Sequence, residues 1–259
     1  EPTADQRRLD NVQHEALFLV GPDEDVFDVR QRNRGGVVLG FYQPSEKRLV
    51  IVSGNDPATL DDEVTLAHEL MHVLQDQHFG LSSFDDSTLD SVNARNGLVE
   101  GDATVVEQAY ERNCETGEWE CVEVRTAGGG LPVDFHWGVY FLGYFPYAEG
   151  PSFVEYYRDR GGWAATDRIY SDIPTTSAEI IDPETYRGDT YGEAVVEDRN
   201  DPAWERVTVE NGADAATVGE AGLTSMFVYT AYADDSPGVV DRDAFRNEGP
   251  NGLDPARPY

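Results

Sequence analysis

The chain of 259 residues carries 50 acidic residues against 19 basic ones, and its net charge is -31. Nucleic acids and anionic membranes repel so acidic a surface, while four Trp, 13 Tyr and 11 Phe supply too much apolar surface for a disordered chain. Lys47 is the only lysine. Self-repulsion would destabilise the compact state at ordinary salt and molar salt would relieve it, so the composition predicts an extreme halophile.

The first clear element in chain order is a β-hairpin in residues 36–53. The segment before it, residues 12–20, favours either a helix or a strand. Apolar residues at 37–42 and 49–52 flank a turn at residues 44–47, which is the pattern of two paired strands.

A helix that contains the motif His68-Glu69-Leu70-Met71-His72 is predicted next, beginning near Pro57 and the acidic residues 61 and 62. Two histidines four apart project from one helix face, so both could bind one zinc ion while Glu69 faces a water molecule. A pair of core histidines with local partners is the alternative. The apolar face expected to pack on the core consists of Leu60, Val64, Ala67, Met71 and Leu74.

Glu100 is the favoured third metal ligand, because a hydrolytic zinc site needs three protein ligands and keeps one position for water. It lies on a second predicted helix, with apolar residues at helical spacing from Leu89 to Tyr110. Gly97 and Gly101 flank it, although an interior helical glycine costs about 1 kcal/mol relative to alanine. We therefore expect this helix to approach the zinc helix closely. The alternative is that Glu100 is a solvated surface acid.

His78 is the competing third ligand. It follows His68 by ten residues, the spacing of the longer motif HExxHxxGxxH, and Met226 is the candidate for the Met-turn that accompanies that motif. The glycine that lets the chain leave the helix is replaced by Gln75, and the helical pattern continues through it. The sequence therefore favours Glu100.

Cys114 and Cys121 bracket a short segment with a turn-forming glycine. A disulfide between them is predicted and indicates an oxidising compartment, with two buried free thiols as the alternative. No apolar run is long enough to span a membrane, and Glu1-Pro2 does not begin a signal peptide, so an exported protein would already have lost its leader.

The second half of the chain is predicted to be mostly helical. After a Gly-rich link at 127–130 and an aromatic segment at 135–147, a helix would begin at Pro151 and end at Gly161-Gly162. Thr176 and Glu179 form a capping box for a short helix, and residues 213–229 form a last helix before a loop-like tail at 234–259. The fold class is thus α+β, as one domain with subdomains at about 1–126 and 127–259.

Taken together, these residues resemble the gluzincins, the zinc metallopeptidases that include thermolysin. His68, Glu69, His72 and Glu100 match the HExxH and helix-borne glutamate of that family, and Asp76 resembles an aspartate of thermolysin-like sequences. The chain is also similar to a group of secreted bacterial and archaeal metallopeptidase-like proteins. That similarity rests on 40–42, 68–79, 98–104, 145–147, 161–163 and 183–186.

The resemblance implies a zincin-like fold and hydrolysis of peptide bonds. Zinc would polarise the carbonyl, and Glu69 would act as the general base. His136 is the candidate oxyanion donor, with a structural histidine as the alternative, and Asp76 and Asp102 are candidate partners of the ligand histidines. By the same resemblance, residues 48–53 or the strand paired with them are the candidate substrate edge. The aromatic residues 141–147 favour core over a substrate pocket.

We therefore expect a secreted or cell-surface zinc metallopeptidase of a halophile, an endopeptidase rather than an exopeptidase. Its partner is a peptide or protein substrate. A catalytically silent zinc scaffold or protein-binding module is the alternative, and a zinc hydrolase for another bond is a third.

Overall fold

The protein is described by a computed structural model that covers residues 2–34, 40–51, 58–84, 88–125, 135–188 and 217–232. Within these ranges one two-stranded antiparallel sheet accompanies a set of helices, which confirms the α+β class. No helix among the described residues is both long and apolar enough to cross a membrane. The predicted Gly-rich link and the tail lie outside the described residues.

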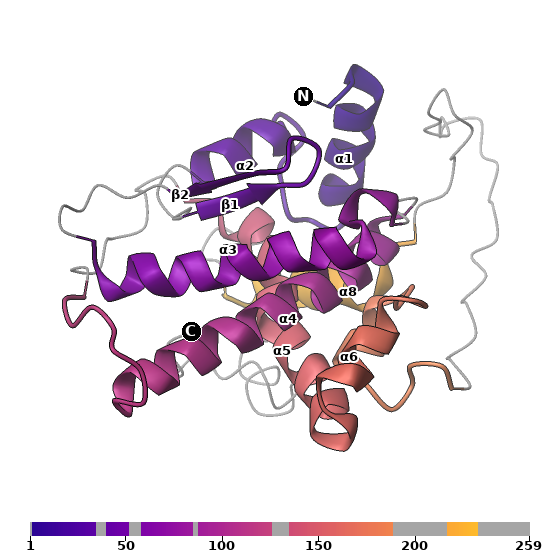
Figure 1. Cartoon of the computed structure of the whole chain (residues 1–259). Coiled ribbons are helices and arrows are strands. Elements are labelled where there is room, and N and C mark those ends of the chain that lie inside the picture. Colours follow the sequence, from indigo (N-terminus) through magenta and orange to yellow (C-terminus); the bar gives the residue numbers. More distant parts are fainter. Residues whose placement is uncertain are drawn as a thin grey trace, which may run out of the picture.

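Two short helices and the hairpin begin the chain. Helix α1 (Ala4–Ala16) covers part of the segment that favoured a helix or a strand, and α2 (Val26–Arg34) follows. Strands β1 (Gly40–Gln43) and β2 (Arg48–Ile51) pair with Gly40 opposite Ile51, so the predicted hairpin is confirmed where it is described. In Figure 1 these elements lie on one side of α3, and α4, α5 and α6 lie on the other.

Helix α3 (Leu60–Phe79) carries the HExxH motif. A capping box between Thr59 and Asp62 begins it, and Gly80, in the left-handed region at φ 69°, ends it. Of the predicted buried face, Leu60 and Val64 are buried, Ala67 and Met71 are half-buried, and the prediction is wrong for Leu74. Leu74 is 50% exposed, and Leu66 and Leu70 are exposed to similar degrees. The buried side of α3 consists of Leu60, Val64, His68, Glu69, His72, Gln75 and Asp76. Hydrogen bonds satisfy most of these polar groups, so the polar face can be buried without apolar side chains.

Helix α4 (Leu89–Glu115) lies between α3 and α5 and carries Glu100. The close approach predicted from its glycines is real, but the partner is α5 rather than α3. A Cβ on Gly101 would lie 2.3 Å from the backbone carbon of Gly150, and a Cβ on Gly150 would lie 2.2 Å from the oxygen of Gly97. The two helix backbones touch here, so neither Gly101 nor Gly150 has room for a side chain without movement of a helix, whereas a Cβ on Gly97 would meet the side chain of Ile180 at 2.9 Å.

Helix α5 (Trp137–Gly161) differs from the prediction of a helix that begins at Pro151. One helix runs through Pro146 and Pro151 and joins the aromatic segment to the predicted helix. Each proline removes one helical N–H donor, but packing against α4 holds the helix together across both. Gly162 ends it, as predicted.

Three further helices follow among the described residues. They are α6 (Trp163–Ile169), which was not predicted, α7 (Ser177–Ile181), whose capping box is confirmed, and α8 (Gly219–Tyr232). A 3-10 turn, η1 (Leu81–Ser83), follows α3. The main apolar core lies among α4, α5, α6, α7 and α8, with Phe153, Leu98 and Ile180 among its most buried members.

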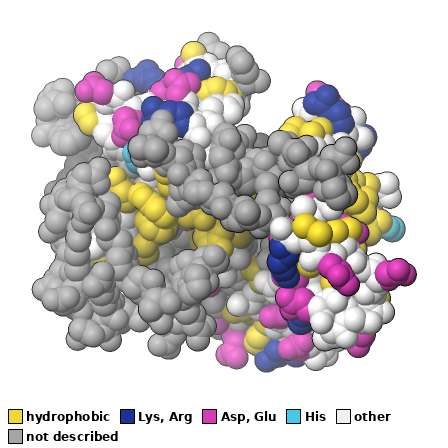
Figure 2. All heavy atoms as spheres, turned by 90° about the vertical axis from the view of Figure 1, so that its left-hand side faces the viewer, with side chains coloured by type: hydrophobic (Ala, Val, Ile, Leu, Met, Phe, Trp, Pro, Cys, Tyr) yellow, Lys and Arg dark blue, Asp and Glu magenta, His cyan; other side chains and the backbone are white. Residues whose placement is uncertain are grey.

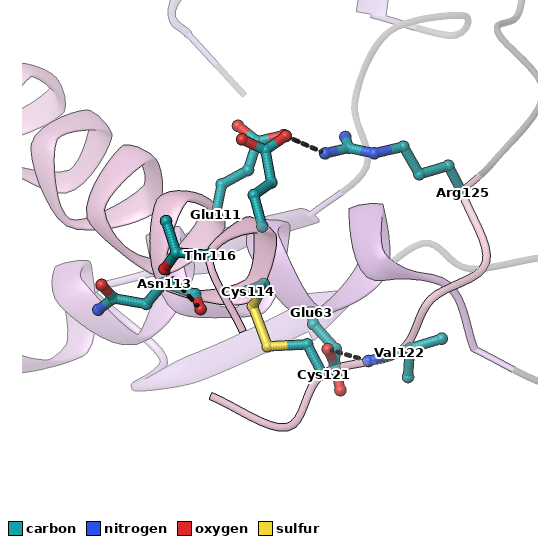
Figure 3. Close-up of a disulfide and its surroundings, with 9 residues drawn as sticks. Glu63, Glu111, Asn113, Cys114, Thr116, Cys121, Val122 and Arg125 are labelled. Atoms are coloured by element: carbon teal, nitrogen blue, oxygen red, sulfur yellow. Dashed lines mark hydrogen bonds and ion pairs between the residues drawn. A yellow bond between two sulfur atoms is a disulfide. The ribbon is translucent and has the colours of Figure 1, made fainter. Parts of the chain in front are cut away.

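The predicted disulfide between Cys114 and Cys121 is present and connects the end of α4 to a segment that crosses the start of α3 (Figure 3). Val122 N donates to Glu63 of α3 over 3.0 Å, and Leu60 N donates to the carbonyl of Val124 over 2.8 Å. Arg125 adds ion pairs to Glu111 and neighbouring acids. The bridge therefore ties together the ends of the two helices that carry the predicted ligands.

Candidate metal centre

His68, His72 and Glu100 converge between α3 and α4. The two histidines are one turn apart on the buried face of α3, and the glutamate projects from the facing side of α4. His68 Nε2 and His72 Nε2 are 3.1 Å apart, and each is 3.2 Å from Glu100 Oε2. One ligand atom from each residue lies within 4.8 Å of the others, so this largely buried group could hold a metal ion.

The charges within this group perturb one another. Burial lowers the pKa of His68, but hydrogen bonds and charge from Glu100 and Glu107 more than offset this and raise it to about 10. The pKa of His72 is also raised, because Glu100 outweighs burial. Burial alone would raise the pKa of Glu100, but the two histidines hold it far below its usual range. The carboxylate is therefore ionised and available as a ligand at neutral pH.

Glu107 and Gln75 hold the outer nitrogens of the two histidines. His68 Nδ1 is 2.8 Å from Glu107 Oε2, and His72 Nδ1 is 2.8 Å from Gln75 Oε1. Such bonds orient an imidazole and leave Nε2 for a metal. Neither residue was predicted from the sequence as a partner of the histidines, although Glu107 follows Glu100 by two helical turns and Gln75 follows His72 by one.

The predicted partners Asp76 and Asp102 do not contact the histidines directly. Asp76 accepts hydrogen bonds from Tyr42 OH at 2.7 Å and from Lys47 Nζ at 2.6 Å, which ties α3 to the hairpin. Asp102 accepts from Tyr170 OH at 2.7 Å and from Gln75 Nε2 at 3.2 Å. Gln75 therefore lies between Asp102 and His72, whereas direct contact was predicted.

His78 lies away from this group. Helix α3 continues past Gln75 to Phe79, and the His78 side chain is exposed near its end. Ten helical residues span about 15 Å, and no turn brings His78 back to His68. Met226, the candidate for a Met-turn, packs against the apolar core from α8. The geometry thus contradicts the alternative based on His78.

Glu69 lies beside the group formed by His68, His72 and Glu100, and one of its carboxylate oxygens is unpaired among the described residues. The residue is only 6% exposed, and its Oε2 has no hydrogen-bond partner among the described residues. Burial raises its pKa, while the nearby histidines partly lower it. A buried acceptor with a raised pKa is a signature of functional carboxylates.

A cavity of about 500 Å³ adjoins Glu69 and His68. Gly40 of β1, Thr65 of α3 and Glu107 of α4 form part of its wall, and α5 contributes a row of side chains at helical spacing: Tyr140, Gly143, Tyr144 and Tyr147. A Cβ on Gly143 would meet nothing within 4 Å. On the face shown in Figure 2, hydrophobic side chains form a patch near the middle, and Asp and Glu side chains lie above it and to its lower right.

Tyr147 packs against one of the ligands. Its ring stacks on that of His68 with centroids 6.1 Å apart and planes at 24°. Although 39% of the residue is exposed, partial burial, followed by the charge of Glu100 and a hydrogen bond to it, raises the pKa of Tyr147, so the hydroxyl is protonated and can donate. The sequence favoured core for this segment, and the side chain instead lines the cavity.

His136 occupies a structural position at the start of α5. Its side chain caps the helix by accepting from Val139 N, and its Nε2 is 3.2 Å from Glu24 Oε2. Asn33 holds both backbone groups of His136. His136 is not among the residues that line the cavity, so the geometry supports Tyr147, rather than His136, as the donor near the ligands.

The site therefore combines two imidazoles and a carboxylate, a buried carboxylate beside them, and a cavity. Two imidazoles with one carboxylate suit zinc or another divalent transition metal, so the donor set and the spare oxygen of Glu69 fit such an ion. A search of protein-family models, of curated proteins and of solved structures gives no match to the chain.

Proposed function

We propose that this protein is a zinc-dependent, gluzincin-like metallopeptidase with a zincin-like fold. The observation that carries the proposal is the position of Glu69, a buried carboxylate with a spare oxygen, between the His68–His72–Glu100 group and an adjoining cavity. A purely structural metal site needs neither a spare buried acid nor a cavity. This observation supports an enzyme over a silent scaffold.

In this proposal His68, His72 and Glu100 hold the metal. When bound, zinc supplies Lewis acidity toward a carbonyl oxygen and lowers the pKa of water. Glu69 takes a proton from the attacking water and passes it to the leaving amine nitrogen. Its raised pKa suits it to both transfers, because a group that gives back a proton needs a pKa nearer to neutrality than an exposed glutamate has.

Tyr147 stabilises the oxygen of the scissile carbonyl as that atom gains negative charge. Its phenol is protonated, and its ring is held against His68 by stacking. A fixed donor in a partly buried site lowers the barrier because it needs no reorganisation during the reaction. Glu107 and Gln75 keep the ligand imidazoles oriented.

The substrate is a peptide that lies in the cavity along β1. Gly40 supports this placement, because it lines the cavity and a Cβ there would lie 3.2 Å from Glu69 Cγ. Arg30, the one arginine or lysine in the described lining, is already paired with Asp10. With Arg30 occupied in this way, we propose cleavage within a chain rather than removal of C-terminal residues, whose terminal carboxylate would need a cation.

A secreted or cell-surface location in a halophile completes the proposal. The disulfide is compatible with an oxidising compartment, and the net charge of -31 accounts for a need for salt. The free energy of unfolding of the metal-free protein should rise between 0.1 M and 3 M KCl. A decrease over that range would contradict the halophilic assignment.

The test combines metal content with peptide cleavage in molar salt. Wild type should hold one zinc per chain and cleave a peptide library, Glu69→Gln should retain zinc and lose cleavage, and Glu100→Ala should lose zinc. His78→Ala is the matched control and should match wild type. Zinc binding without cleavage of any peptide would identify a silent scaffold, and full activity of a zinc-loaded Glu69→Gln would refute the role of Glu69.

A further inference from the structure

Gln75 is fully buried and links the metal group to two more distant residues. Its Oε1 accepts from His72 Nδ1 over 2.8 Å. Its amide nitrogen lies 2.9 Å from the carbonyl oxygen of Val99, 3.2 Å from Asp102 Oδ2 and 2.9 Å from Tyr170 OH. Tyr170 OH in turn donates to the same oxygen of Asp102 over 2.7 Å.

This surrounding permits only one orientation of the Gln75 amide. The carbonyl oxygen of Val99 and Oδ2 of Asp102 both accept hydrogen bonds, so the NH2 group must face them. A flipped amide would place its oxygen against these two acceptors in a buried site, where unpaired polar groups cost about 1 to 3 kcal/mol each. The oxygen of Gln75 must therefore face His72.

The orientation of Gln75 determines which nitrogen of His72 carries the proton. An oxygen at 2.8 Å from Nδ1 requires an N–H donor there. In a neutral imidazole the lone pair is then on Nε2, the atom that faces His68 and Glu100. His68 is oriented differently, because the carboxylate of Glu107 contacts its Nδ1 directly.

We infer that Asp102 and Tyr170 are positioning residues of the metal site, which act through the amide of Gln75 to hold His72 as an Nδ1–H, Nε2-binding ligand. The inference rests on the proposed zinc site but not on peptide cleavage. Asp102 comes from α4 and Tyr170 from the end of α6. Three separate elements thus set the state of one ligand.

The first test compares two tyrosines in zinc binding. Tyr170→Phe removes the hydroxyl of the relay while its ring can keep stacking on Phe79. Tyr186→Phe removes the hydroxyl of a similarly buried residue, one that donates to the carbonyl of Asp172. Zinc affinity, measured by competition with a chelator in molar KCl, should fall roughly tenfold in Tyr170→Phe. It should be unchanged in Tyr186→Phe. Equal affinities in the two variants would overturn the inference.

The second test exchanges donor and acceptor. Gln75→Glu offers His72 an acceptor but places a second oxygen against Val99 and Asp102, so zinc affinity should fall roughly 10- to 100-fold. Adding Asp102→Asn should restore part of this loss, because the new amide at position 102 can donate to the new carboxylate. A double variant no better than the single one would contradict the relay.

Nitrogen NMR of the zinc-loaded protein provides a readout that a merely structural role would not change. The His72 proton should be on Nδ1 in wild type and Tyr186→Phe, and a mixture of states should appear in Tyr170→Phe, where the amide of Gln75 is held less firmly. Zinc binding is measured without substrate. A wild type that binds zinc but cleaves nothing would therefore overturn the proposed peptidase alone, whereas one that binds no zinc would overturn both.

Discussion

The two glycines Gly101 and Gly143 should respond in opposite ways to the same substitution. Both lie inside long helices, where alanine is intrinsically favoured over glycine by about 1 kcal/mol. A Cβ on Gly143 meets nothing within 4 Å, so Gly143→Ala should increase the free energy of unfolding by up to about 1 kcal/mol.

In Gly101→Ala the new Cβ would lie 2.3 Å from the backbone carbon and 2.4 Å from the oxygen of Gly150. Carbon atoms pack at about 3.5 to 4.0 Å, so α5 must move on the order of 1 Å from α4. The contacts are backbone atoms and cannot relax by changing a rotamer. Overpacking of this kind costs about 3 kcal/mol, so a net loss of about 2 kcal/mol remains after the gain in helix propensity.

Urea denaturation of both variants in molar KCl with a chelator present would measure this difference in the metal-free protein. The chelator removes any contribution of zinc binding to stability. The expected separation is about 3 kcal/mol between the two variants, obtained by combining the loss with the gain. A Gly101→Ala protein as stable as Gly143→Ala would refute the close packing of α4 on α5.

Three further predictions concern the cavity, the hairpin and the disulfide. Gly143→Trp should reduce kcat/KM for large peptides by at least about tenfold without loss of stability, because its side chain would project into the open cavity; equal kinetics for wild type and variant would exclude the cavity as the substrate site. Burial raises the pKa of Asp76, but Lys47 and Tyr42 lower it by a larger amount, so the pKa lies below its usual value. The stabilisation by Asp76 is therefore present above its usual pKa and lost as pH falls through the depressed value, and a pH series of unfolding should show this in wild type and not in Asp76→Asn. Reduction of Cys114–Cys121 should lower the free energy of unfolding by about 2 to 3 kcal/mol, and unchanged denaturation with reductant would show that the loop needs no bridge.

Local signals in the sequence predicted several features of the site correctly. The i, i+4 spacing places His68 and His72 on one face of a helix whatever the fold around it. The absence of glycine at Gln75 predicted that α3 continues and carries His78 away, as it does. The Cys114–Cys121 bridge also follows from a short separation along the chain.

Glu100 shows where such local reasoning reaches its limit. The glycines that flank Glu100 predicted close packing of α4 against another helix. That packing exists, but the helix that contacts Gly101 is α5 rather than α3. Which helix approaches a glycine depends on long-range packing, which residue spacing does not encode. The same limit applies to α5, because Pro151 is a valid helix start in isolation and only packing against α4 shows that the helix continues through it.

The sequence by itself therefore identified the three side chains of the candidate metal site, and the tertiary structure decided its surroundings. Helix caps and ligand spacing act over one or two turns, so they are legible in a single chain. The partners Glu107, Gln75, Tyr147 and Tyr170 come from α4, α3, α5 and the end of α6. Their roles depend on distances between helices, and those distances exist only once the core has packed.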